Sequence, residues 1–164
     1  MDSPSSSLPP GIDHIPGKDP KLFLLHRRIL SPHLTITPVY VFLSIVFINM
    51  KVKIGENIFN VKTLVKPKDQ KIGMMKRSFD NTFNGMLFLM GGDDQCFWMK
   101  NCIIPLDILM IRNNVIVNIH HNCEPCQGDD CPSYCGNGNI VLELEGGTCE
   151  GLGIEPGDSV HYIL

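Results

Sequence analysis

Residues 50–164 contain a series of short segments with the composition of β-strands, separated by glycine, asparagine or proline turns. Each segment is four to eight residues long and rich in Val, Ile, Leu and Phe, which suit the half-buried surface of a sheet. Turn signals at 55–57 and 113–114 predict hairpins. The pattern predicts a mostly β fold, a small barrel-like or sandwich-like domain of six to eight short strands. The expected strands are Lys51–Ile54, Ile58–Val65, Gly85–Met90, Cys96–Met99, Leu106–Arg112, Val115–His120, Asn139–Leu144 and Ser159–Leu164.

One or two short helices complete this expectation. Pro67 suits the first position of a helix, and the segment 67–78 can carry one with a narrow apolar stripe formed by Ile72 and Met75. A second helical turn is expected near Cys149–Leu152. The chain of 164 residues is long enough for one domain with a hydrophobic core.

The first forty-nine residues form a leader of different composition. Residues 1–20 are rich in Ser, Pro, Gly and Asp, which predicts disorder. Three basic residues then precede an apolar run at 34–50, and this order is typical of a signal peptide or a signal anchor. However, Pro38 interrupts the run and no small-x-small cleavage site follows it.

Three interpretations of this leader therefore stand side by side. In the first, the leader is dispensable and translation starts at Met50, which predicts a cytoplasmic protein. In the second, the run at 34–50 is a transmembrane anchor, the one part of the chain through which a membrane contact is expected. In the third, the leader is cleaved and the protein is exported.

The charge of the chain argues against nucleic-acid binding. The formal net charge is −3, and residues 50–164 hold ten Lys and Arg against fourteen Asp and Glu. No basic run is present, whereas binding to phosphates needs clustered Lys and Arg.

A polar cluster follows apolar residues in the segment 96–107. Trp98, Lys100, Asn101 and Asp107 are the candidate ligand-binding residues, with the indole as an aromatic wall and a Lys100–Asp107 pair across a bend. We expect the indole itself to be substantially buried, and its removal to cost roughly 3–5 kcal/mol. The alternative is structural, with the asparagine and the aspartate satisfying backbone groups at the end of a strand.

Seven cysteines occur after residue 95, and four of them lie within thirteen residues. Cys123, Cys126, Cys131 and Cys135 are candidate ligands of a zinc ion, because a tight C-x2-C pair supplies two thiolates to a tetrahedral site. His120 and His121 could replace two of the thiolates as ligands. Disulfides and inert thiols are the alternatives. A nucleophilic pair of Cys102 or Cys149 with a histidine has no support from spacing.

Several ordered blocks resemble the domain of unknown function 192 family. The segment 97–109 contains FWMKN followed by IPLDIL, and further blocks agree at Lys71–Arg77, Gly85–Phe88, Val141–Leu144 with Gly147, and Gly153–Val160. The resemblance covers nearly all of 50–164 and none of the leader. It implies a small β-barrel-like fold with no established activity, often exported. Cys126 and Cys131 match a pair seen in exported relatives, PC-x4-CP-x-Y, which implies a disulfide between them. The chain departs from the family at Cys102, where threonine is usual.

No motif of a known enzymatic mechanism is present, such as GxSxG, HExxH, GxGxxG or a Walker loop. Our leading interpretation is a non-enzymatic, β-rich binding or structural domain. The first alternative is a zinc-binding module built on the loop Cys123–Cys135. The second is an enzyme that uses the polar cluster of the segment 96–107.

Overall fold

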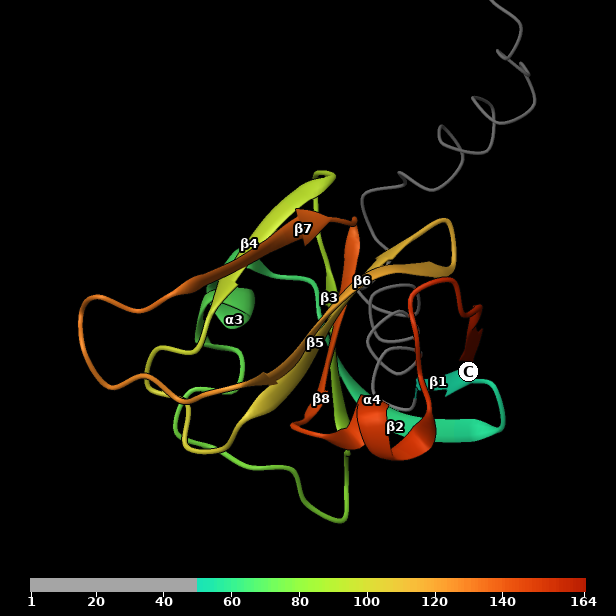
Figure 1. Cartoon of the computed structure of the whole chain (residues 1–164), viewed down its shortest axis with the longest axis horizontal. Coiled ribbons are helices and arrows are strands. Elements are labelled where there is room, and N and C mark those ends of the chain that lie inside the picture. The colour runs from blue at the N-terminus through green and yellow to red at the C-terminus, as the bar shows by residue number, and fades with distance from the viewer. Residues whose placement is uncertain (1–49) are drawn as a thin grey trace, which may run out of the picture. The chain divides into compact units, whose positions relative to one another are not determined.

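A computed structural model describes residues 50–164 (Figure 1). The predicted leader, with the apolar run at 34–49, lies outside the described residues. No helix within 50–164 has the length and apolar character needed to cross a membrane. The elements are β1 (Lys51–Ile54), β2 (Asn57–Leu64), α3 (Pro67–Ile72), β3 (Gly85–Leu89), β4 (Asp94–Trp98), β5 (Leu106–Arg112), β6 (Val115–Cys123), β7 (Ser133–Asn137), β8 (Ile140–Glu145), α4 (Thr148–Leu152) and β9 (Val160–Ile163).

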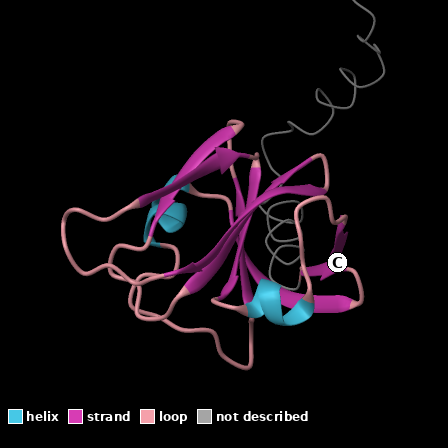
Figure 2. Cartoon of the chain, in the orientation of Figure 1, coloured by secondary structure: helices cyan, strands magenta, loops and turns pink. Residues whose placement is uncertain are grey.

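The fold of the described residues is mostly β, as the spacing predicts, with nine strands and two short helices (Figure 2). Seven strands form a curled, half-barrel sheet in the order β6-β5-β8-β3-β2-β1-β9, and β4 and β7 form a second, two-stranded sheet. All pairs are antiparallel except β2 with β3. The predicted hairpins are β1–β2 and β5–β6.

The strands β3, β5 and β8 of the large sheet are buried on both faces, which explains their nearly continuous apolar runs. Side chains alternate between the two faces along each strand. On β8, Leu142 and Leu144 enter the core shared with β1, β2 and α4, while Val141 enters the second core. Glu143 lies on the same face of β8 as Val141, and this second face is the one that α3 and the β4–β7 sheet cover.

The helix α3 is attached to the sheet mainly through one side chain. Pro67 occupies the start of the helix, where a missing N–H costs no helical hydrogen bond. Gln70 Nε2 donates to the carbonyl oxygens of Leu64, at 3.1 Å, and Leu89, at 2.8 Å. These two bonds join the helix to the ends of β2 and β3. The helix ends at Gly73, whose φ of 45° suits glycine.

The strand β7 was not among the expected strands. Its residues Ser133–Asn137 are polar and belong to the cysteine-rich segment, which reads as an irregular loop. In the structure this strand pairs with β4 along its whole length, with Cys135 opposite Cys96. The segment therefore forms a strand because it pairs with a distant strand. Local composition does not predict such a pairing.

The prediction that Trp98 is substantially buried is wrong. The strand β4 alternates between exposed and half-buried residues, and Trp98 falls on the outer side with 43% of its surface exposed. Phe97 takes the inner side instead, and its ring packs edge-on against Phe88 with centroids 5.0 Å apart. The apolar residues 96–98 thus belong to a strand whose side chains alternate between an inner and an outer face.

Trp98→Ala is accordingly expected to lower the free energy of unfolding by about 1 kcal/mol, because much of the indole is already in water. Phe97→Ala is the matched variant, and we expect a loss of about 2–3 kcal/mol for this inward ring. Chemical denaturation followed by circular dichroism measures both. A loss above about 3 kcal/mol for Trp98→Ala would show that the indole is buried after all.

Candidate functional site

A cavity of about 260 Å³ lies between α3 and β4, on the face of the large sheet that carries Val141 and Phe88. Its walls are mostly apolar and rich in sulfur and aromatic rings. A concave, mainly apolar pocket with few polar groups is the usual form of a small-molecule site. The methionines and aromatic residues that line it are Met74, Met75, Phe88, Met90, Phe97 and Trp98.

Glu143 is a buried ionisable side chain of this cavity. It lies on the central strand β8, with Met86 of β3 and Ile108 of β5 as its register neighbours, and only 4% of its surface is exposed. Its Oε2 atom is buried and has no hydrogen-bond partner among the described residues. Burial raises the pKa of Glu143 to about 8, since a desolvated carboxylate is unfavourable. An unsatisfied buried carboxyl is costly for stability, and such groups gather at functional sites.

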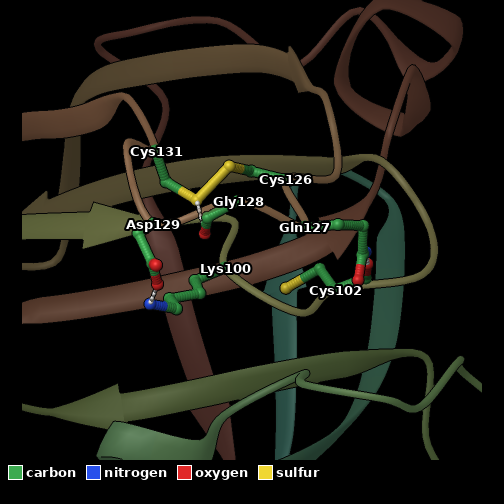
Figure 3. Close-up of a disulfide and its surroundings, with 7 residues drawn as sticks. All are labelled: Lys100, Cys102, Cys126, Gln127, Gly128, Asp129 and Cys131. Atoms are coloured by element: carbon green, nitrogen blue, oxygen red, sulfur yellow. Dashed lines mark hydrogen bonds and ion pairs between the residues drawn. A yellow bond between two sulfur atoms is a disulfide. The ribbon is translucent and has the colours of Figure 1, made fainter.

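Cys102 lines the same cavity and is 4% exposed. Its backbone N–H donates to Met99 O at 3.1 Å, and its carbonyl accepts from Gln127 Nε2 at 2.7 Å (Figure 3). Burial, and then the charge of Glu143, raise the pKa of the Cys102 thiol to about 11. The thiol therefore stays protonated near neutral pH and is a poor nucleophile.

The four residues predicted to form one polar ligand site do not lie together in the structure. Lys100 Nζ lies 2.8 Å from Asp129 Oδ1 (Figure 3). The same Nζ lies 5.6 Å from the centroid of the Trp98 ring. Asn101 has a φ of 57°, a left-handed conformation that asparagine tolerates. Its backbone N–H donates to the carbonyl of Cys126, and its carbonyl accepts from the N–H of Lys76. The expected Lys100–Asp107 pair is wrong, because the lysine turns outward to the loop while the aspartate is buried. Of the four candidates, Trp98 alone lines the cavity.

Asp107 has the structural role of the alternative interpretation. It is fully buried, and its carboxylate accepts three backbone N–H groups. Oδ1 accepts from Asn122 at 2.7 Å and from Gly147 at 3.1 Å, and Oδ2 accepts from Cys149 at 2.7 Å. The aspartate therefore joins β5 to β6 and to the start of α4.

The four cysteines predicted to bind zinc are not brought together. Cys135 is joined to Cys96 across β4 and β7, with an S–S distance of 2.05 Å. Cys126 is joined to Cys131 at 2.06 Å (Figure 3), the pair that the family resemblance implies. Cys123 is buried, and its thiol donates to the backbone carbonyl of His120. Among residues 50–164, no three His, Cys, Asp or Glu side chains gather in a way that could hold a metal ion.

The structure also gives no support for His120 and His121 as zinc ligands or for a Cys–His nucleophilic pair. His120 Nε2 lies 3.0 Å from the carbonyl oxygen of Cys135 and 3.2 Å from Asn118 Nδ2. His121 is exposed. Cys149 is buried, and its thiol pKa is raised by burial and by Asp107. Among the described residues, none of the three free thiols forms a hydrogen bond with a histidine ring, so the structure, like the spacing, gives no support for a histidine-activated thiol.

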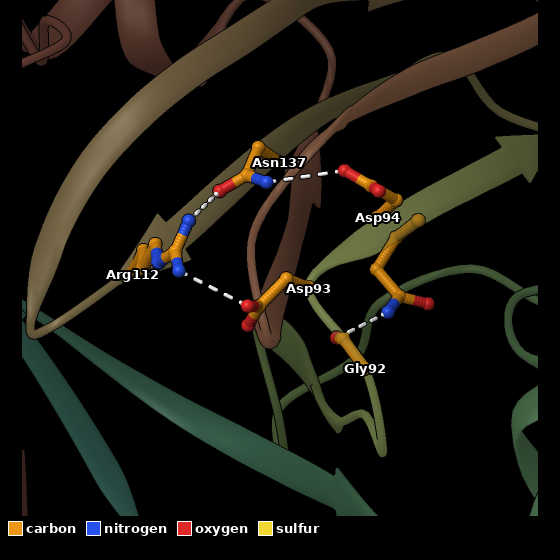
Figure 4. Close-up of polar contacts among 6 residues, drawn as sticks. Gly92, Asp93, Asp94, Arg112 and Asn137 are labelled. Atoms are coloured by element: carbon orange, nitrogen blue, oxygen red, sulfur yellow. Dashed lines mark hydrogen bonds and ion pairs between the residues drawn. The ribbon is translucent and has the colours of Figure 1, made fainter. Parts of the chain in front are cut away.

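The Cys96–Cys135 disulfide and a polar network together fix the small sheet, whose strand β4 forms one wall of the cavity. Arg112, at the end of β5, lies between Asn137 of β7 and Asp93 (Figure 4). The Arg112–Asp93 ion pair spans 3.0 Å, and Asn137 Nδ2 donates to Asp94 Oδ1 at 3.1 Å. The network joins both strands of the small sheet to the large one.

Removal of the two disulfides is expected to have unequal effects. The paired variant Cys96→Ser/Cys135→Ser opens a link across 39 residues and should lower the free energy of unfolding by about 3 kcal/mol. The paired variant Cys126→Ser/Cys131→Ser opens a link across 5 residues and should lose less, about 2 kcal/mol at most. Urea denaturation of both variants measures this. Equal losses would contradict the account of β4 and β7.

Sequence reasoning did not select Glu143, although the chain carried a signal for it. The residue is a charged side chain inside the apolar run 140–144, at the position where alternation places it on the same face as Val141. A buried strand with one ionisable residue on an inward face is itself a candidate site.

Comparisons with known proteins identify one family and two similar solved structures. The model of the DUF192 family, described as "Uncharacterized ACR", matches residues 48–162. A protein of unknown function from Novosphingobium aromaticivorans DSM 12444 is 33% identical with a TM-score of 0.61, covering 68% of this chain and 83% of its own. A "putative transcription regulator" from Sinorhizobium meliloti 1021 is 30% identical with a TM-score of 0.61, covering 69% of this chain and 91% of its own. A search of curated proteins found no match.

Proposed function

The chain belongs to the DUF192 family, and from that premise we propose that its domain is a non-enzymatic module that binds a small molecule in the cavity at Glu143. The single observation that carries this proposal is the unpartnered Oε2 of Glu143, buried at a cavity that mainly apolar side chains line. A ligand with one polar group and an apolar body would satisfy the carboxyl and fill the space around it.

The chemistry around the cavity supports binding over catalysis. Its buried titratable groups are Glu143 and Cys102, and burial holds both in the protonated form near neutral pH. A protonated thiol is a poor nucleophile, and no histidine lines the cavity to activate it.

The acidic excess of residues 50–164 supports a small-molecule ligand over a nucleic acid. The relative from Sinorhizobium meliloti carries a name that suggests transcription. Direct binding to DNA needs clustered Lys and Arg, which this chain lacks, so we do not infer DNA binding for it.

Trp98 offers a direct test, because it is the sole tryptophan of the chain and lines the cavity. A fragment library of small amines, alcohols, amides and carboxylic acids would be screened against the full chain by tryptophan fluorescence and thermal shift. We expect hits with an apolar body and one polar group. The hits should persist in Glu145→Gln, an exposed change on the same strand, and disappear in Glu143→Leu. Hits that Glu143→Leu leaves intact, or a library without hits, would overturn the proposal.

A further inference from the structure

We propose that the ligand of this cavity is an organic cation, a protonated amine attached to an apolar body. The inference deepens the proposed function and rests on it. It names the chemical class that the Glu143 carboxylate and its surroundings fit best.

The first argument is the missing counter-ion. Among residues 50–164 the ion pairs are Lys53–Glu56, Lys100–Asp129 and Arg112–Asp93, and none of them includes Glu143. A buried carboxylate is stable only when a cation or several hydrogen-bond donors compensate its charge. Since no Lys or Arg of the described residues forms an ion pair with Glu143, a ligand ammonium group is the partner that would complete the site.

The second argument is the chemistry of the walls. Phe88, Phe97 and Trp98 line the cavity, and aromatic faces attract cations electrostatically. The thioethers of Met74 and Met90 are polarisable and adapt to an apolar body of irregular shape. A neutral ligand could hydrogen-bond to the protonated carboxyl, but only a cation gains from both the ionised carboxylate and these ring faces.

The charged and titratable groups of the protein around Glu143 do not act as the counter-ion of its carboxylate. Lys71 of α3 lines the cavity but is exposed to solvent, which screens its charge. The thiols of Cys102 and Cys123 sense the charge of Glu143, and burial raises their pKa values to about 11 and about 12. Both thiols are therefore neutral over the pH range in which Glu143 titrates. Cys96, on β4, is in a disulfide and does not titrate.

Binding of an ammonium group then releases one proton. Glu143 is protonated in the free protein at neutral pH and must ionise to pair with the cation, and its proton passes to solvent. The amine enters and leaves already protonated, so no bond to the ligand forms or breaks. Because only the ionised fraction binds, affinity should rise about 50-fold between pH 6 and pH 8.

The probes are 2-phenylethylamine and its neutral analogue 2-phenylethanol, which share the same apolar body. Dissociation constants would be measured by Trp98 fluorescence on the full chain at pH 6, 7 and 8. We expect the amine to bind at least about tenfold more tightly than the alcohol at pH 8, as one charge-assisted contact provides. Glu143→Gln should remove both this preference and its pH dependence, whereas Glu145→Gln should keep them.

The outcomes separate the two proposals. Equal binding of amine and alcohol, or a preference that Glu143→Gln retains, would overturn the cation proposal and leave the cavity as a binding site. If neither probe binds while other fragments do, the cation proposal also fails. If no fragment binds, the proposed function fails with it. The pH profile of the native chain decides the matter even where Glu143→Gln does not fold, since an affinity that stays constant from pH 6 to 8 contradicts the proton release.

Discussion

Asp107→Ala is expected to lower the free energy of unfolding by about 5 kcal/mol, or to prevent folding altogether. The substitution leaves three backbone N–H groups without their acceptor, those of Asn122, Gly147 and Cys149. The aspartate is fully buried, so water does not readily replace the carboxylate. Each buried donor left unsatisfied costs about 1–3 kcal/mol. The effect is on folding, since the aspartate lies outside the cavity.

Asp107→Asn is the matched control. Its carbonyl oxygen can still accept from Asn122 and Gly147, but its NH2 group opposes the N–H of Cys149. We therefore expect an intermediate loss, about half that of the alanine variant. Urea denaturation followed by circular dichroism measures both. A loss below about 1 kcal/mol for Asp107→Ala would show that these three bonds do not hold β5, β6 and α4 together.

The stability of the ligand-free protein is expected to fall as pH rises toward 8, and Glu143 is the cause. Its pKa is 4.5 in an unfolded chain and about 8 in the folded protein. Between these values the folded state holds a proton that the unfolded state has lost, so the free energy of unfolding decreases with rising pH. The contribution is fully present below pH 4.5 and is lost by about pH 8, a change on the order of 4 kcal/mol.

Glu143→Gln isolates this contribution from the other titrating groups. The glutamine is neutral in both states, so its difference in stability from the native protein should be small at pH 5. The difference should grow to favour the variant by about 4 kcal/mol at pH 9. Glu145→Gln, at an exposed position of the same strand, should behave like the native protein. Parallel stability curves for the native protein and Glu143→Gln would show that the carboxyl is not buried.

The strands of the large sheet were predictable because local patterns decide them. The expected segments near Lys51–Ile54, Gly85–Met90 and Leu106–Arg112 are strands, and the two hairpins follow the turn signals. The exposure of Trp98 was not predictable from composition. An apolar run reads as buried, but whether a strand such as β4 has one or two covered faces depends on the pairing of distant segments.

The cysteine-rich segment shows the same limit. The spacing of Cys123, Cys126, Cys131 and Cys135 fits a metal knuckle, a disulfide or free thiols equally well, because spacing along the chain does not fix distances in space. The partner of Cys135 is Cys96, 39 residues away, and only the antiparallel pairing of β4 with β7 brings them together. Glu143 was missed for a related reason, since its cavity is formed by residues from four separate parts of the chain.

The most direct test of the binding site uses the methionines as reporters. The full chain would be labelled with 13C-methyl methionine and titrated in parallel with 2-phenylethylamine and 2-phenylethanol. The methyl signals of Met74, Met75 and Met90, which line the cavity, should shift with at least one probe, while Met50, in the opposite core, should not. If a probe that binds to the chain moves none of the three cavity signals, or if Met50 moves as much as they do, the cavity at Glu143 is not the ligand site.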